Sequence, residues 1–230
     1  ATQNGVTPLY IACEKGQLEC VQLLLEAGAA INQAPQHGGT PLYIACEKGH
    51  LDIVRLLRDA GASVNQAAED GCTPLMNAAY GANAAVTKVL VQRQPRCVEM
   101  RDDLGRTALM IAAEAGAARH ASGARARAAR VAHHLLRVGA STNASALDGR
   151  TAVHLAAQHG NAAVLRLLLS AAGSVEATDC CGVTPLAHAV TGGHCACARI
   201  LLAAGATTTA LFPGEICTAA DLKSVLSTDA

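Results

Sequence analysis

Aromatic residues are nearly absent from this sequence. Its 230 residues include no Trp, one Phe and three Tyr, whereas a compact core in a chain of this length normally uses more aromatic side chains to fill its centre. Hydrophobic residues still make up 51% of the chain, mostly as Ala, Leu and Val. The composition therefore favours a thin fold, extended in one dimension, in which small side chains pack closely.

Several other features are missing as well. No apolar run approaches the roughly 20 residues that a membrane-spanning helix needs, and the formal net charge is zero. The sequence contains no phosphate-binding Gly-Lys-Ser/Thr loop and no Gly-x-Ser-x-Gly elbow, which carry the chemistry of many nucleotide and ester hydrolases. We therefore predict no membrane span, no catalytic residue and no cofactor.

What the sequence does contain is a repeat. The ten residues 7–16 recur letter for letter at 40–49, an offset of 33 residues. Related triplets, Thr followed by Pro or Ala and then Leu or Val, begin at Thr73, Thr107, Thr151 and Thr184. The step from Thr107 to Thr151 is longer, at 44 residues, which indicates an 11-residue insertion in the fourth unit.

Each unit predicts two helices joined by turns. Thr is a good helix N-cap and Pro suits the first helical position, so we expect an inner helix after each Thr. The apolar stripe that follows, as in residues 51–57, predicts a second, outer helix. Glycines should end these helices where a positive φ is required. They are Gly16, Gly49, Gly116 and Gly160 for the inner helices, and Gly28, Gly61, Gly139 and Gly205 for the outer ones.

This pattern resembles the ankyrin repeat, whose motif is Thr-Pro-Leu-His-x-Ala with a 33-residue period. The fourth position is His only at His154, and Ala108 and Ala152 replace Pro in two units. The resemblance implies an all-α solenoid with short hairpin-like turn tips. We expect six repeats, at about 4–36, 37–69, 70–103, 104–147, 148–180 and 181–214, and a shortened closing unit at 215–230.

The first repeat has the same apolar outer helix as the second and lacks the polar face of a terminal repeat. Because the chain also begins at Ala1 and not at Met, we expect it to be part of a longer protein. Its ten cysteines come without a secretory signal. We therefore expect free thiols and a cytoplasmic or nuclear location.

The repeat register assigns most cysteines and histidines to structural roles. Cys13, Cys20, Cys46, Cys195 and Cys197 fall at helix positions expected to be core, whereas Cys72, Cys180, Cys181 and Cys217 should lie exposed on turn tips. His134 takes an outer-helix Leu position and should be partly buried. The resemblance implies structural hydrogen bonds for His154 and His194. The Cys and His residues near the C-terminus lack the paired spacing of structural zinc sites, so we predict no metal.

The resemblance also implies a partner bound by the turn tips and by the concave face of the inner helices. Side chains four, seven and eight residues after each Thr should point toward that partner. Tyr80 stands out because aromatic side chains are enriched at binding hot spots, although packing across the neighbouring repeat is an equal alternative. The candidate contacts are Ile11, Glu14, Lys15, Ile44, Glu47, Lys48, Asn77, Tyr80, Glu114, Gln158 and His159.

The insertion in repeat four, residues 117–130, departs furthest from the pattern. It carries Arg119, Arg125, Arg127 and Arg130, and it should lengthen the helices or turn near Ser122. The segment 88–137 holds ten of the 18 basic residues and four of the 18 acidic ones. Because arginine pairs with carboxylates and phosphates through two hydrogen bonds, these four arginines form a candidate second binding surface. A soluble low-complexity insert is the alternative.

The sequence thus predicts a protein-interaction scaffold, with an acidic protein surface as the favoured partner of the insertion. Two other functions stay open. One is nucleic-acid or anionic-lipid binding through the central basic segment, which lacks aromatic residues for base stacking and a long amphipathic basic helix. The other is regulation of an enzyme whose catalytic part lies outside this chain.

Overall fold

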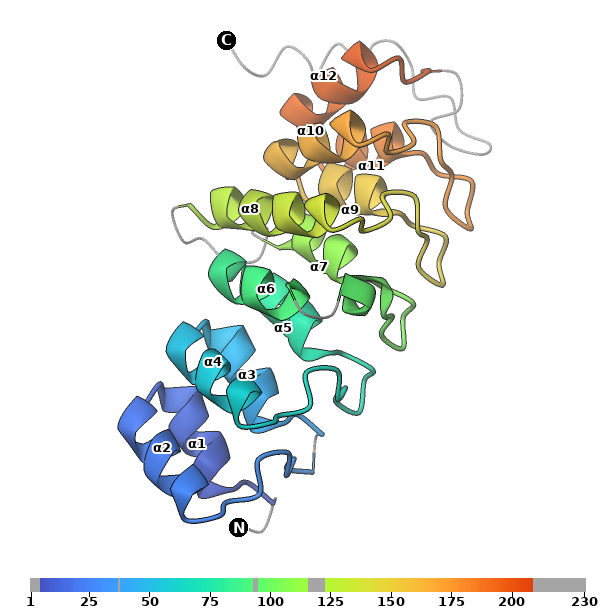
Figure 1. Cartoon of the computed structure of the whole chain (residues 1–230). Coiled ribbons are helices and arrows are strands. Elements are labelled where there is room, and N and C mark those ends of the chain that lie inside the picture. Colours follow the sequence, from blue (N-terminus) through green and yellow to red (C-terminus); the bar gives the residue numbers. More distant parts are fainter. Residues whose placement is uncertain (1–4, 37, 93–94, 116–122, 209–230) are drawn as a thin grey trace.

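The computed structural model describes residues 5–36, 38–92, 95–115 and 123–208, and within these ranges the chain is an elongated stack of helices (Figure 1). The inner helices are α1 (Pro8–Lys15), α3 (Pro41–Lys48), α5 (Pro74–Tyr80), α7 (Ala108–Glu114), α9 (Ala152–Gln158) and α11 (Pro185–Thr191). The outer helices are α2 (Leu18–Glu26), α4 (Leu51–Asp59), α6 (Ala84–Val91), α8 (Ala124–Arg137), α10 (Ala162–Ser170) and α12 (Cys195–Ala203), and a short 3-10 helix, η1 (Pro95–Glu99), follows α6. The predicted all-α solenoid is confirmed.

The inner helices begin where Thr and Pro predict. In four repeats the Thr hydroxyl accepts a hydrogen bond of 3.1–3.3 Å from the backbone N–H three residues later, and Pro occupies the first helical position. Thr107, which Ala108 follows, makes no such bond, and its buried hydroxyl has no partner among the described residues. Packing therefore holds the start of α7 without the usual cap.

Glycines end the helices largely as predicted. Gly16 and Gly49 cap α1 and α3 with φ of 73° and 79°. One position differs, because His159 ends α9 and Gly160 follows it with φ of 65°. Gly116 lies outside the described residues. After the outer helices, the backbone turns at Gly28, Gly61, Gly139 and Gly205, with φ between 80° and 93°.

The repeats are joined by hairpin-like turns whose tips lie on one side of the stack (Figure 1). Within a tip, the N–H of Asp179 donates to the Val183 carbonyl at 3.1 Å. Between neighbouring tips, the N–H of Leu147 donates to the Leu104 carbonyl at 2.9 Å. Cross-tip bonds of this kind fix the spacing of adjacent turns, so side chains on two tips keep a defined relative position.

One continuous hydrophobic core runs along the described stack. The small pair of each inner helix is completely buried in the middle repeats, as at Ala78, Ala79, Ala112 and Ala113. Because these alanines let the inner helices approach closely, the core has little room for aromatic rings, which accounts for their scarcity. Tyr10 is buried and Tyr43 is half-buried.

A polar side chain at the start of several outer helices binds the end of the inner helix in the preceding repeat. Asn83 Nδ2 donates to the carbonyls of Cys46 and Glu47 at 2.8 and 2.6 Å, and Asn161 Nδ2 donates to the Ala115 carbonyl at 3.1 Å. These carbonyls end a helix and have no partner within it. Position 49 favours glycine, because its φ is 79° and a Cβ there would lie 2.6 Å from Asn83 Oδ1.

Two cysteine predictions are wrong. Cys20 is exposed, because no outer helix among the described residues covers that side of α2, whereas Cys197 at the same register is completely buried. Cys72 is buried, because it belongs to the hydrophobic core against which Tyr43 of the preceding repeat also packs. Cys13 and Cys46 are buried as predicted, Cys195 is half-buried, and Cys180 and Cys181 are exposed. Cys217 lies outside the described residues.

We expect all ten cysteines to be free thiols. The nine described cysteines form no disulfide, and burial raises the pKa of Cys13 to about 12 and of Cys197 to about 11. A thiol reagent should therefore modify Cys20, Cys180 and Cys181 quickly, because they are exposed. The buried cysteines should react slowly, because the reagent does not reach them and their raised pKa leaves little of the reactive thiolate. Mass spectrometry after brief labelling checks the sites. Unfolded, unreduced protein that titrates with far fewer than ten thiols would contradict the prediction.

The insertion lengthens the outer helix of repeat four. Helix α8 has 14 residues, against nine in α4, and the additional residues extend its N-terminal end. Arg125 and Arg127 lie on this extension, and Arg130 lies on the part of α8 that matches α4. Of the predicted turn, Gly123 immediately precedes α8 with φ of 82°, while Arg119 and Ser122 lie outside the described residues.

Candidate functional site

The positions four residues after Thr40 and Thr73 do not reach the surface, which corrects the sequence prediction for these two repeats. Ile44 and Asn77 are 5% and 4% exposed, because they lie between adjacent inner helices. Asn77 Nδ2 donates to the Tyr43 carbonyl at 3.1 Å, so its amide is used within the stack. Ile11 is 42% exposed, because no inner helix among the described residues covers that side of α1.

The positions seven and eight residues after each Thr do reach the surface. Tyr80 is 53% exposed, which favours a solvent-facing side chain over one packed flat on its neighbour. Glu114, Gln158 and His159 are half-buried on the same side of α7 and α9. In the first two repeats this face carries the surface ion pairs Glu14–Lys15 and Glu47–Lys48. Exposed pairs of this kind contribute little to stability.

Two leucines are exposed on neighbouring turn tips of repeats four and five. Leu104 is 59% exposed and Leu147 is 77% exposed. The backbone hydrogen bond between them holds the two tips together. Single exposed leucines are common on protein surfaces, but two on adjacent and rigidly spaced tips form a small apolar surface beside the polar residues of α7 and α9.

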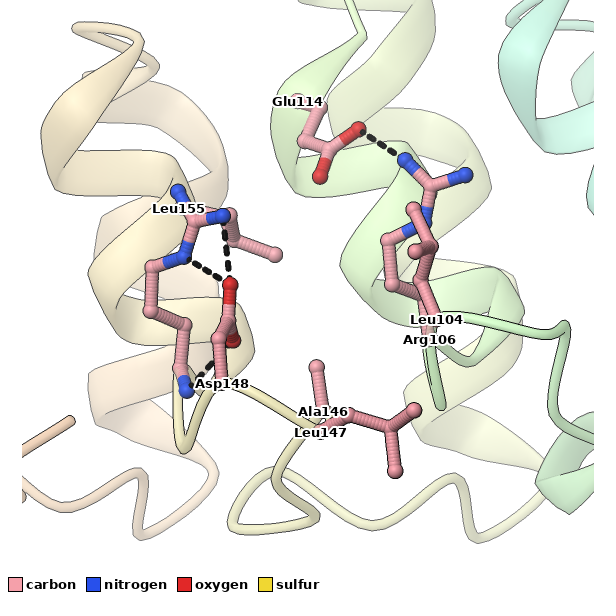
Figure 2. Close-up of a pocket in the computed structure, with 8 residues that line it drawn as sticks. Leu104, Arg106, Glu114, Ala146, Leu147, Asp148 and Leu155 are labelled. Atoms are coloured by element: carbon pink, nitrogen blue, oxygen red, sulfur yellow. Dashed lines mark hydrogen bonds and ion pairs between the residues drawn. The ribbon is translucent and has the colours of Figure 1, made fainter. Parts of the chain in front are cut away.

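A cavity of about 190 Å³ opens between these tips and the inner helices. Figure 2 shows Leu104, Arg106 and Glu114 on one side of it and Asp148 and Leu155 on the other, with Leu147 between them near the tips. Its walls come from two repeats, so the stacking of repeats four and five creates it. A space of this size accommodates a single side chain of a partner.

Two arginines at equivalent positions of the two repeats flank the cavity. Arg106 Nε donates to Asp102 Oδ2 at 2.8 Å, and its Nη1 donates to Glu114 Oε2 at 3.2 Å. In the next repeat, Arg150 Nε donates to Asp148 Oδ2 at 2.6 Å and Nη1 donates to Gln158 Oε1 at 2.7 Å. The cavity therefore has apolar residues at its mouth and two fixed polar walls.

Burial and charge shift the carboxyl groups at the cavity in opposite directions. Burial raises the pKa of Glu114, although Arg106 and Arg150 lower it. The hydrogen bond from Arg150 lowers the pKa of the more exposed Asp148. Each of these two carboxylates is paired with an arginine of its own repeat, Glu114 with Arg106 and Asp148 with Arg150.

Comparison with protein families identifies the fold. A family model described as ankyrin repeats (3 copies) matches residues 1–68, 60–126 and 120–210. The chain belongs to the ankyrin repeat family. No individual curated protein matches it. Ankyrin repeats are in general protein–protein interaction modules, and binding of another protein is accordingly the general function of this chain's fold.

Sequence reasoning missed Leu104, Leu147, Arg106 and Arg150, although the ankyrin register contains a signal for them. Residue 104 directly precedes the turn glycine, where repeats three and five have the polar residues Asp70 and Asp148. The fold of the repeat does not require an apolar side chain at that exposed position. The arginines directly precede Thr107 and Thr151, and side chains at that position lie opposite the seventh residue after Thr.

The remaining His, Cys, Asp and Glu residues do not form a further candidate site within the described part of the chain. In the described part of the chain, no three His, Cys, Asp or Glu side chains are grouped so as to hold a metal ion. His134 is half-buried on α8, as predicted. A helix both long and apolar enough to cross a membrane does not occur among the described residues.

Proposed function

We propose that this ankyrin repeat chain binds a partner protein through the turn tips and inner helices of repeats three to five. The exposed pair Leu104 and Leu147, at the mouth of a cavity between two repeats, carries the proposal. A partner places one apolar side chain between the two leucines, in the cavity that Arg106 and Arg150 flank. Around this contact, Tyr80, Glu114, Gln158 and His159 supply a half-exposed and mostly polar rim.

The physical basis is the usual anatomy of a protein interface, an apolar centre within a polar rim. Binding removes the two leucine side chains from water, and such burial is favourable in proportion to the apolar area covered. The ion pairs of Arg106 and Arg150 are already formed, so the walls of the cavity need little ordering when a partner binds. A partner protein in the cytoplasm or nucleus is the one we favour.

The test replaces Leu104 and Leu147 together with serine. A partner is first isolated with the wild-type chain and purified, and its affinity is then measured by isothermal titration calorimetry. We expect the double variant to bind at least about thirtyfold more weakly, because truncating a central apolar contact costs about 1 kcal/mol or more per residue. The matched control is Leu23→Ser, which removes an equally exposed leucine, 65% accessible, from α2 of repeat one.

The control should bind as the wild type does, because Leu23 lies on an outer helix far along the stack (Figure 1). Circular dichroism of all three proteins verifies that the helices are retained. Equal affinity of the double variant and the wild type for the partner would show that the tips of repeats four and five are not part of the interface. A loss that Leu23→Ser reproduces would show a general effect of surface leucines instead.

A further inference from the structure

Seven basic residues gather on the outer helices of the C-terminal half of the stack. We define the cationic outer face as Lys88 on α6, four arginines on α8, Arg166 on α10 and Arg199 on α12, where those on α8 are Arg125, Arg127, Arg130 and Arg137. Arg127 is half-buried and the other six are exposed. These four helices, which are described in full, contain no Asp or Glu.

The basic residues lie on one connected surface. Helix α8 packs against α6 on one side and α10 on the other, and α10 packs against α12 (Figure 1). Lys88 and Arg137 both lie close enough to His134 to lower its pKa, in addition to the effect of its burial. Burial raises the pKa of Cys197, and Arg125 and Arg166 both lie close enough to lower it in part. The charges of neighbouring helices thus reinforce one another.

Helix stability does not explain this arrangement. Cations near a helix N-terminus are unfavourable, yet Arg125 and Arg127 occupy the start of α8, which has no acidic residue in its first turn. On α4, by contrast, Arg55 and Arg58 pair with Asp52 and Asp59 at 3.5 and 2.9 Å. Among the described residues, no ion pair involves any of the four arginines of α8.

We propose that the cationic outer face binds an extended acidic segment of a polypeptide, separately from the partner contact at Leu104 and Leu147. Arginine, which provides six of the seven cations, pairs with carboxylates through two parallel hydrogen bonds. Adjacent packed helices lie about 8–10 Å apart. The path from α6 to α12 is therefore about 30 Å, which roughly nine residues of extended chain span.

Two other polyanions fit the surface less well. Single-stranded nucleic acid is usually held by large aromatic side chains on which its bases stack, and none of these four helices carries Phe, Tyr or Trp. A membrane surface is usually held by apolar side chains that insert among the lipids as well as by charge. No large hydrophobic side chain of the four helices is among the exposed ones. A flexible acidic peptide needs charge alone.

The experiment measures fluorescence anisotropy of a labelled peptide of about twelve residues, mostly Glu with interspersed Ser. The test variant is Arg130→Gln with Arg137→Gln, and the matched control is Arg55→Gln with Arg58→Gln, which removes two arginines from outer helix α4. We expect the test variant to bind at least fivefold more weakly than the wild type, and the control to bind within about twofold. Binding should also weaken steeply between about 50 and 200 mM salt, because the contacts are screened.

Further probes separate this proposal from its alternatives. A duplex DNA of equal total charge, or vesicles containing phosphatidylserine, that bind more tightly than the peptide would overturn the choice of partner. Equal peptide affinity of the two arginine variants would overturn the site. The Leu104→Ser, Leu147→Ser variant should bind the peptide as the wild type does, so failure of the partner contact leaves this result unaffected.

Discussion

Replacing His154 with alanine should destabilise the protein by about 4 kcal/mol, because the side chain is large, completely buried and hydrogen-bonded at both ring nitrogens. Nδ1 accepts from the Thr151 N–H at 3.1 Å, so Nε2 carries the proton and donates to the Val183 carbonyl at 3.2 Å. The ring thus joins the start of α9 to the turn of the next repeat. Alanine leaves a cavity and two buried polar groups without partners.

Urea denaturation followed by circular dichroism at 222 nm measures this change. The control is His133→Ala on α8, which removes an exposed histidine and should change the free energy of unfolding by less than about 0.5 kcal/mol. Equal stability of the two variants would show that His154 is not a structural link. The predicted structural role of His154 already agrees with its hydrogen bonds.

His154 also makes stability depend on pH. Burial lowers its pKa in the folded state, and the nearby His188 lowers it further. The unfolded chain therefore takes up a proton near pH 6.5, at which the folded chain does not. The stabilisation is complete above that pH and is lost as the pH falls toward the folded-state pKa. His154→Gln, which does not titrate, should flatten the decline of the thermal midpoint between about pH 7.5 and 5.5.

Much of this fold could be predicted because most repeats carry the same local sequence signals at their helix ends. A Thr–Pro start and a glycine stop fix the ends of α1 and α3 by hydrogen bonding and by φ. Each of these signals depends on residues only a few positions apart, so it can be recognised in the sequence alone. They fail at Cys20, whose exposure depends on what lies beside α2 and not on the register of its own repeat.

The candidate site could be predicted only in part, because it depends on contacts between repeats. The register placed Tyr80 and Glu114 on the accessible face, but it treated Ile44 and Asn77 in the same way. Their burial results from the close approach of α3, α5 and α7, which no single repeat reveals. The cavity arises between two tips whose spacing is set by the hydrogen bond from Leu147 to Leu104.

Replacing Asp102 with alanine should destabilise the protein by about 3 kcal/mol, because this carboxylate organises the turn tip that presents Leu104. Asp102 is 7% exposed. Its Oδ1 accepts from the N–H groups of Leu104 and Arg106 at 3.1 and 2.7 Å, and its Oδ2 accepts from Arg106 Nε at 2.8 Å. Alanine leaves these donors without their acceptor and frees the Arg106 guanidinium from one of its two carboxylate partners.

The neighbouring Asp103 provides the matched control, since it is exposed and its side chain accepts no hydrogen bond among those described. Asp103→Ala should change the free energy of unfolding by less than about 0.5 kcal/mol in the same urea experiment. Hydrogen exchange of the Leu104 and Arg106 amides adds a local measurement, and both should exchange faster in Asp102→Ala. Unchanged exchange would mean that the backbone alone holds the tip. Faster exchange together with weaker partner binding would show that the cavity requires the order that Asp102 imposes on Leu104.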